Sequence, residues 1–224
     1  MKRNFIVFFA VVAILTGCKT RTMNENPFLN ERYNTPFEVP PFDKIKAEHY
    51  KPAYLKGMEE QKRNVQAIIN NPQAPTFENT IKALEYSGEL LSKVSRVFGS
   101  LNSAHTNDTL QAFNKEIAPL LARHRDDISL NDSLFRRVQQ VYENRDKFKL
   151  TGEEQKVLED TYKSFVRNGA ALSPEDKEKL RKINEELSLL TVRFSENLLA
   201  ETNAFKLILE REEELAGLPE GVRK

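Results

Sequence analysis

Apolar residues recur at helical spacing through most of the chain, and helix-start and helix-stop residues divide them into six segments. Pro52 suits the first turn of a helix, and the apolar positions after it continue to a stop signal at residues 70–72. Thr76 is a suitable N-cap for a second segment that runs through Leu101. We expect this second helix to bend near Gly88.

Polar capping residues mark the next three segments. Asn107 and Asn131 are suitable N-caps for the third and fourth helices. Thr151 and Glu154 have the spacing of a capping box, in which each side chain accepts a hydrogen bond from the other's free backbone N–H. The fifth helix is therefore predicted to run from there to about Asn168.

The sixth segment has the most regular pattern. Ser173 and the proline after it form a helix-start signal. A seam of apolar residues then alternates spacings of three and four, at Leu180, Ile183, Leu187, Leu190 and Phe194, with Leu198 continuing the face. This pattern predicts a long helix packed antiparallel on a neighbour, and a dimerising coiled coil is the alternative. Apolar residues outside the seam need a second partner, namely Leu189, Val192 and Leu199. Residues 206–210 are expected to form a short strand or an extended link.

Composition agrees with an all-α fold, a multi-helix antiparallel array. Charged residues make up 30% of the chain, and glycine occurs only 8 times. The single cysteine excludes an intramolecular disulfide framework and any cysteine-rich zinc or iron–sulfur site. Lys and Arg total 34 against 33 Asp and Glu, so we expect no nucleic-acid partner, because phosphate binding needs a basic excess on one face.

The N-terminus resembles a bacterial lipoprotein signal. Lys2 and Arg3 precede an apolar run over residues 5–15, which is too short to span a membrane. The following Leu-Thr-Gly-Cys resembles a lipobox, which implies cleavage between Gly17 and Cys18 and lipidation of Cys18. An ordinary secretory signal, giving a secreted protein, is the alternative.

This interpretation divides the chain into a signal peptide over residues 1–17, a lipid-anchored tether over residues 18–42 and a helical region over residues 43–224. Prolines and asparagines interrupt every periodic run in the tether, although part of it could instead pack along the helical region. The lipid on Cys18 would hold the protein to a bacterial membrane on its periplasmic side.

Residues for catalysis or metal binding are scarce. His49, His105 and His124 lie far apart, and no His-Glu-x-x-His occurs, so local sequence assembles no zinc site. No Gly-x-Ser-x-Gly, phosphate-binding glycine loop or Cys/His nucleophile pattern is present either. We therefore predict no catalytic and no metal-ligating residue in this chain.

A charge run at Arg123, Arg125, Asp126 and Asp127 is most simply a solvated helix end. The acidic residues at 210 and 212–214 are interpreted in the same way.

Several short stretches carry a more specific signal: residues 71–81 (NPQAPTFENTI), 83–85, 87–91, 104–108 (AHTND), 165–167 and 215–219 (LAGLP). Together they resemble the N-terminal region of the thimet-oligopeptidase-like zinc metallopeptidases, and the match covers almost all of residues 26–224. Residues 26–29 and 104–108 look most like bacterial peptidyl-dipeptidases (dipeptidyl carboxypeptidases), with oligopeptidase A as the alternative.

The resemblance implies an all-helical ellipsoid split by a deep channel, in which this chain builds the N-terminal wall. The intact family proteins are expected to hydrolyse short peptides with a zinc ion that polarises the scissile carbonyl and activates a water molecule. The peptidyl-dipeptidases release C-terminal dipeptides. The family's His-Glu-x-x-His helix and further Glu ligand lie downstream of the matched region, and none of them maps onto this sequence. The chain alone is therefore expected to bind no zinc and to be inactive.

Two interpretations remain open at this stage. The chain is either the N-terminal fragment of a zinc peptidase or a complete, non-catalytic helical lipoprotein or interaction module derived from that family. A helix-start signal at residues 218–220, only four residues before the end, favours the fragment.

Overall fold

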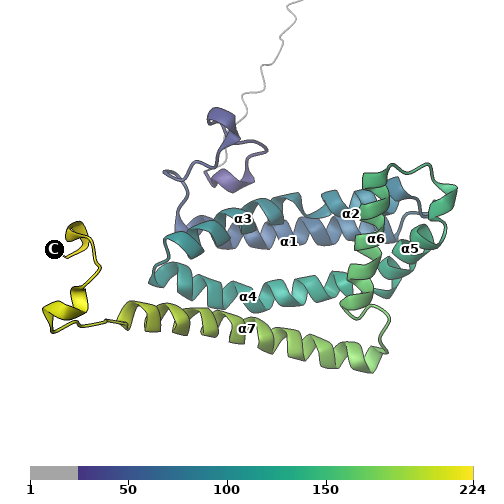
Figure 1. Cartoon of the computed structure of the whole chain (residues 1–224). Coiled ribbons are helices and arrows are strands. Elements are labelled where there is room, and N and C mark those ends of the chain that lie inside the picture. The colour runs from purple at the N-terminus through teal and green to yellow at the C-terminus, as the bar shows by residue number, and fades with distance from the viewer. Residues whose placement is uncertain (1–24, 224) are drawn as a thin grey trace, which may run out of the picture.

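The computed structural model describes residues 25–223, and these residues form helices and connecting loops without a strand (Figure 1). The all-α prediction is confirmed. The predicted signal peptide and Cys18 lie outside the described residues. No helix among residues 25–223 is both long enough and apolar enough to cross a membrane.

Six longer helices build the fold: α1 (Ala47–Ile69), α3 (Glu89–Ala104), α4 (Asp108–Ser129), α5 (Asp132–Glu143), α6 (Gly152–Arg167) and α7 (Pro174–Ala204). Between α1 and α3 the chain forms a π-helical turn (Phe77–Lys82), the short α2 (Ala83–Glu85) and a 3-10 turn (Tyr86–Gly88). Further 3-10 turns are Pro27–Leu29, Pro36–Glu38, Arg145–Lys147, Glu212–Leu215 and Glu220–Val222.

The predicted caps are those that the structure uses. Thr76, Asn107, Asn131 and Thr151 each accept a hydrogen bond from a backbone N–H in the first turn of the following helix, and so does Ser173. The predicted bend is also present, since the turn ending at Gly88 separates α2 from α3.

The predicted start of the first helix is wrong. The helix begins at Ala47, and Pro52 lies inside it. The cause is a cap that sequence reasoning did not identify, in which the backbone N–H of Lys46 donates to Nδ1 of His49 at 3.1 Å. This bond satisfies a backbone donor upstream of the proline, so the helix starts earlier.

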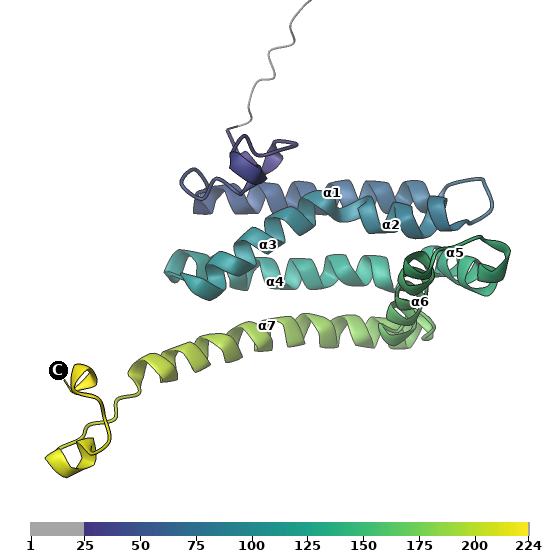
Figure 2. The ribbon, with the colours of Figure 1, turned by 45° about the horizontal axis from the view of Figure 1, so that its top comes forward.

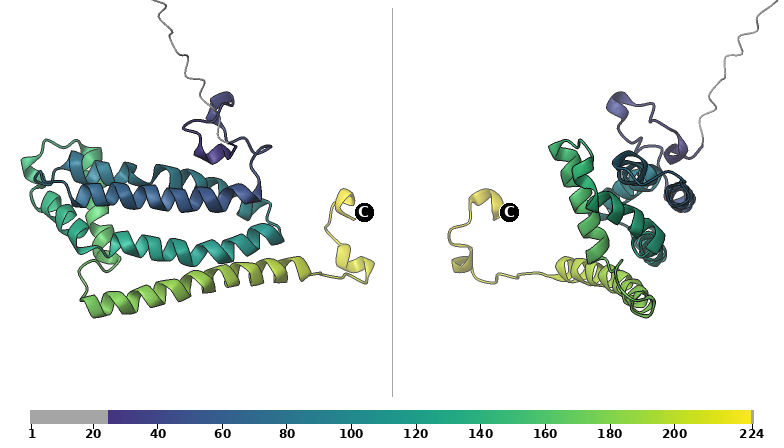
Figure 3. Two further views of the ribbon diagram at one scale, coloured as in Figure 1. Left: turned by 180° about the vertical axis from the view of Figure 1, so that it is seen from behind. Right: turned by 90° about the vertical axis from the view of Figure 1, so that its right-hand side faces the viewer.

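The long helices lie side by side, with α5 and α6 crossing one end of the array (Figures 1 and 2). Contacts of α3 and α4 with α1 show that α3 runs antiparallel and α4 parallel to α1. The axes of α1 and α3 approach closely at Gly57, where an added Cβ would lie 2.9 Å from the Cα of Leu91. The helix α7 lies on the outer side of α4, away from α1 (Figure 3).

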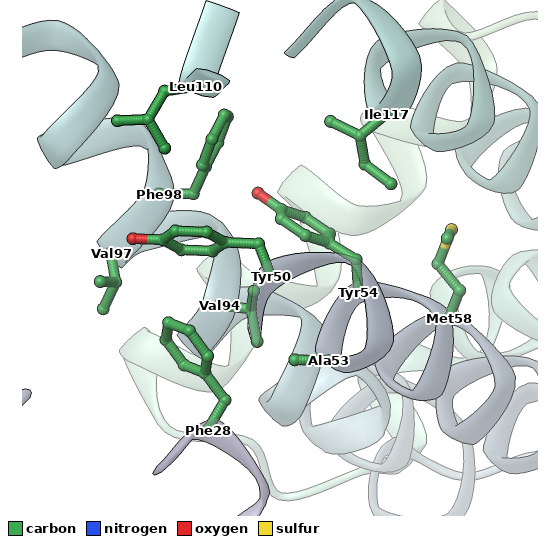
Figure 4. Packing of buried hydrophobic residues seen from close by; sticks show 10 residues of the cluster. All are labelled: Phe28, Tyr50, Ala53, Tyr54, Met58, Val94, Val97, Phe98, Leu110 and Ile117. Atoms are coloured by element: carbon green, nitrogen blue, oxygen red, sulfur yellow. The ribbon is translucent and has the colours of Figure 1, made fainter. Parts of the chain in front are cut away.

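Two apolar clusters form the core. The first joins α1, α3 and α4 around Phe98, whose ring contacts the rings of Tyr50 and Tyr54 edge to face (Figure 4). Phe28, which is fully buried, belongs to this cluster. The second cluster joins the other end of α1 to the π-helical turn, α5 and α6, around Ile81, Leu134 and Leu158.

Part of the segment before α1 packs on the helices. Asn26 donates a hydrogen bond from Nδ2 to the carbonyl oxygen of His49 at 2.8 Å, and Phe28 enters the first cluster. Residues 26–28 are therefore anchored to the array, which is the alternative considered for the segment before residue 43. At the other end, residues 205–210 form an irregular link and no strand, after which the chain continues away from α7 (Figure 1).

The helix α7 contributes no residue to the buried part of either cluster. Leu180 in its predicted seam is half-buried, but the rest of the seam is exposed: the exposed fraction is 58% for Ile183, 56% for Leu187, 47% for Leu190 and 70% for Phe194. Only Val192, which the prediction assigned to a second partner, is buried among the apolar residues of α7. The predicted antiparallel packing is observed, since Lys115 pairs with Glu196 and Asp127 with Arg181, but the face predicted to make it is wrong.

Candidate functional site

A hollow with a volume of about 680 Å³ lies between α1, α3, α4 and α6. Its apolar lining includes Phe98, Ile117 and Phe165, and its polar lining includes Asn102, Asn114 and Asn168. These amides, and the serine hydroxyls that also line the hollow, can form hydrogen bonds with peptide groups or other neutral polar ligands. His124 is the one lining residue with an ordinary pKa near neutrality.

A relay of hydrogen bonds fixes His124 at the wall of this hollow. Its Nε2 lies 2.8 Å from Oε1 of Gln61, and the Gln61 amide donates from Nε2 to Oγ of Ser87 at 3.4 Å. The Ser87 hydroxyl in turn donates to the carbonyl oxygen of Leu84 at 2.7 Å. Because Oε1 of Gln61 can only accept, Nε2 of His124 carries the proton. The buried Nδ1 has no partner in the described residues.

Burial lowers the pKa of His124, and the nearby positive charge of Lys62 lowers it further. The imidazole is therefore neutral at neutral pH. Its environment suits a fixed interior hydrogen-bond donor.

A ladder of polar pairs joins α4, and Asp132 at the start of α5, to α7, and we refer to it below as the polar ladder. From one end to the other its pairs are Asp132 with Lys177, Asp127 with Arg181, Asp126 with Asn184, Arg123 with Glu185 and Lys115 with Glu196. Residue numbers rise on α7 as they fall on α4, so the two helices are antiparallel. The side of α7 that contacts α4 is thus mainly polar, which leaves its apolar side uncovered.

The central carboxylates of the ladder have opposite pKa shifts. Burial raises the pKa of Asp126, although the hydrogen bond from Asn184 opposes that shift. Burial also acts to raise the pKa of Asp127, but the hydrogen bond and charge of Lys62, 2.8 Å away, together with Arg181 outweigh it and lower that pKa. Asp127 therefore links α1, α4 and α7 as a stable carboxylate.

This arrangement corrects the interpretation of residues 123–127 as a solvated helix end. Asp126 is only 4% exposed, and Arg123 and Asp127 both pair with α7. A sequence signal for this pairing exists. In both α4 and α7 an arginine is followed four residues later by an acidic residue. The pairs are Arg123 with Asp127 and Arg181 with Glu185. Opposite charges then face each other only if the helices run antiparallel.

The three histidines do not come together. His49 caps α1, His105 is exposed at the end of α3, and His124 contacts Gln61. Among residues 25–223, no three His, Cys, Asp or Glu side chains are grouped so that they could hold a metal ion. The described residues therefore do not fit a zinc ion.

The sequence of this chain is similar to part of several known peptidases. No protein-family model matches the chain. The chain is 41% identical over 195 residues to the dipeptidyl carboxypeptidase of Escherichia coli (strain K12), which covers 87% of this chain and 28% of that protein. The dipeptidyl carboxypeptidase of Salmonella typhimurium is 40% identical over 196 residues, covering 88% of the chain and 29% of the relative. Oligopeptidase A of Escherichia coli is 27% identical over 195 residues, with 87% and 28% covered. The chain thus spans less than a third of the length of these relatives.

Proposed function

Since this chain is a homologue of the peptidases that include dipeptidyl carboxypeptidase and oligopeptidase A, we propose that it supplies the N-terminal, non-catalytic helical part of such a peptidase. The intact enzyme would hydrolyse short peptides with a zinc ion held by residues outside the matched region. The observation that carries the proposal is the 41% identity over 195 residues, sustained across 87% of the chain.

The chemistry of the described residues supports the proposal that this chain is non-catalytic and that the zinc ligands lie elsewhere in the enzyme. They supply a buried neutral histidine, amides and paired carboxylates, but no grouped metal ligands among residues 25–223. Activation of water by zinc needs three protein ligands and an open coordination position. The contribution of this chain is therefore to build and stabilise one wall around the peptide-binding region.

We further propose that the peptides are shortened by removal of C-terminal dipeptides. Identity to the two dipeptidyl carboxypeptidases, at 41% and 40%, exceeds identity to the Escherichia coli oligopeptidase A, at 27%. For localisation we propose the periplasmic side of a bacterial membrane, with Cys18 as the lipid-bearing residue. The support for this is the Leu-Thr-Gly-Cys sequence after an apolar run.

A chimera tests the proposed function. Residues 19–224 of this chain replace the homologous stretch of the Escherichia coli dipeptidyl carboxypeptidase, and release of C-terminal dipeptides from a short peptide is measured. We expect the chimera to be active and the 224-residue chain to be inactive under the same conditions.

Two results would contradict the proposal. A folded, zinc-loaded chimera without peptidase activity would favour the non-catalytic lipoprotein or interaction module. Peptide hydrolysis by the purified 224-residue chain, abolished by a chelator, would show that it holds a catalytic centre of its own.

A further inference from the structure

A trough runs along the exposed side of α4. The 680 Å³ hollow beside α3 and a second hollow of about 460 Å³ beside α7 share residues of α4, including Asn114, Leu121 and Arg125. The exposed side of α4 is thus the floor, with α3 as one wall and α7 as the other. Asn168, just after α6, lines both hollows and marks one end of the trough.

The wall formed by α7 is apolar on its outer part. Leu187 lines the second hollow and belongs to the exposed row that also contains Ile183, Leu190, Phe194 and Leu198. This row extends over about 22 Å at 1.5 Å per residue, or roughly four helical turns. Soluble monomers seldom leave so continuous an apolar surface uncovered.

The polar ladder explains why this row has no partner within the described residues. Ion pairs and the hydrogen bond between Asp126 and Asn184 occupy the side of α7 that contacts α4. Placing the apolar row against α4 would break these pairs and bury unpaired charges, which is strongly unfavourable. The apolar row is therefore available to another part of a larger structure.

We propose that the trough and the apolar row of α7 form the surface on which the remaining polypeptide of the peptidase packs. This inference rests on the proposed function. The relatives match this chain over only 28–29% of their length, so more than two thirds of their polypeptide has no counterpart in it. The expected occupant is an amphipathic helix of that remaining part, with an apolar stripe facing α7 and polar groups meeting Asn114 and Arg125.

Cysteine accessibility tests this proposal. Residues 19–224 contain no cysteine, so single cysteines can be introduced by Phe194→Cys on the apolar row and Glu178→Cys on the other side of α7 as the matched control. Each variant is prepared in the isolated chain and in the chimera described above, with the relative's own cysteines replaced. The rate of reaction with a maleimide is then measured.

In the isolated chain we expect fast labelling at both positions, independent of protein concentration. In the chimera, labelling at position 194 should be at least about tenfold slower, whereas labelling at position 178 should change little, because only the covered site needs an opening step before it reacts. Equal rates at position 194 in both proteins would overturn the proposal. Slow labelling of the isolated chain that disappears on dilution would assign the surface to a second copy instead.

This readout is independent of peptidase activity. An active chimera with a reactive cysteine at position 194 contradicts the docking surface alone, and an inactive chimera with a protected cysteine contradicts the proposed function alone. If the chimera does not fold, hydrogen exchange supplies the comparison. The stretch of the Escherichia coli relative aligned with residues 174–204 should then exchange more slowly than α7 in the isolated chain, and equal exchange would overturn the proposal.

Discussion

Asp126 of α4, with 4% of its surface exposed, accepts a hydrogen bond of 2.8 Å from Nδ2 of Asn184 of α7. A buried carboxylate beside one neutral donor is only partly compensated for the loss of water, and burial raises its pKa. This pair lies in the middle of the polar ladder, where Arg181 and Arg123 reach the neighbouring acids. We therefore expect the attachment of α7 to depend on pH.

The first prediction concerns Asp126→Asn. In wild type the folded state holds the Asp126 proton more tightly than the unfolded state does, so protonation stabilises the fold. The wild-type free energy of unfolding, relative to the variant, should therefore fall as pH rises from about 4, the ordinary carboxyl pKa, toward neutrality. Urea unfolding of both proteins across this range measures the difference, and a constant difference would contradict the assignment.

The second prediction has the opposite sign and concerns His124. Its pKa is lowered by burial and by Lys62, so the unfolded chain takes up this proton first as pH falls. Stability contributed by the neutral ring should be present above about pH 6.5 and lost as pH falls below it. His124→Phe should remove this part of the pH dependence, while His105→Gln, at an exposed position, should retain it.

The third prediction uses two glycines with different surroundings. Gly57→Ala places a Cβ 2.9 Å from the Cα and N of Leu91, so α1 and α3 must separate, at a cost of about 1–3 kcal/mol in unfolding free energy. Gly99→Ala, inside α3 with nothing within 4 Å of the new Cβ, should stabilise the protein by about 0.5–1 kcal/mol. Thermal or urea unfolding distinguishes the two, and equal effects would show that the helices do not approach as described.

Sequence reasoning succeeded where the determinants are local. The caps Thr76, Asn107 and Asn131 act on backbone groups within one turn, so residue type and spacing were sufficient to predict them. The resemblance to the peptidase family was confirmed by the relatives, because it depended on whole stretches of sequence.

Sequence reasoning failed to predict which face of α7 packs on α4, because that choice depends on the surface of the neighbouring helix. The seam through Leu187 and Leu190 has the spacing of a packed helix face, but the spacing does not show which surface covers it. In the structure, the residues of α7 that contact α4 are instead Arg181, Asn184 and Glu185. The contact between His124 and Gln61 could not be predicted from the sequence either, because the two residues are 63 positions apart in the chain.

The fourth prediction concerns the N-terminus, which lies outside the described residues. We expect the mature protein to begin at Cys18 with a lipidated thiol and to fractionate with membranes, since a diacylglycerol and an acyl chain together exceed the threshold for stable anchoring. Mass spectrometry of the mature N-terminus measures this, with Cys18→Ala as the control. Normal processing of Cys18→Ala, or an unmodified Cys18, would leave an ordinary secreted protein.

The last prediction concerns the exposed row of α7 in the isolated chain. Because Leu190 and Phe194 are 47% and 70% exposed, Leu190→Gln and Phe194→Gln should each change the unfolding free energy by less than about 0.5 kcal/mol. Both should reduce the fluorescence of a hydrophobic dye, since they remove the apolar surface that binds it. Val192→Gln, at a position only 8% exposed, should instead cost about 1–3 kcal/mol by burying an unpaired amide. A large stability loss at Leu190 or Phe194, with no change in dye binding, would mean that the row is already covered in the isolated chain.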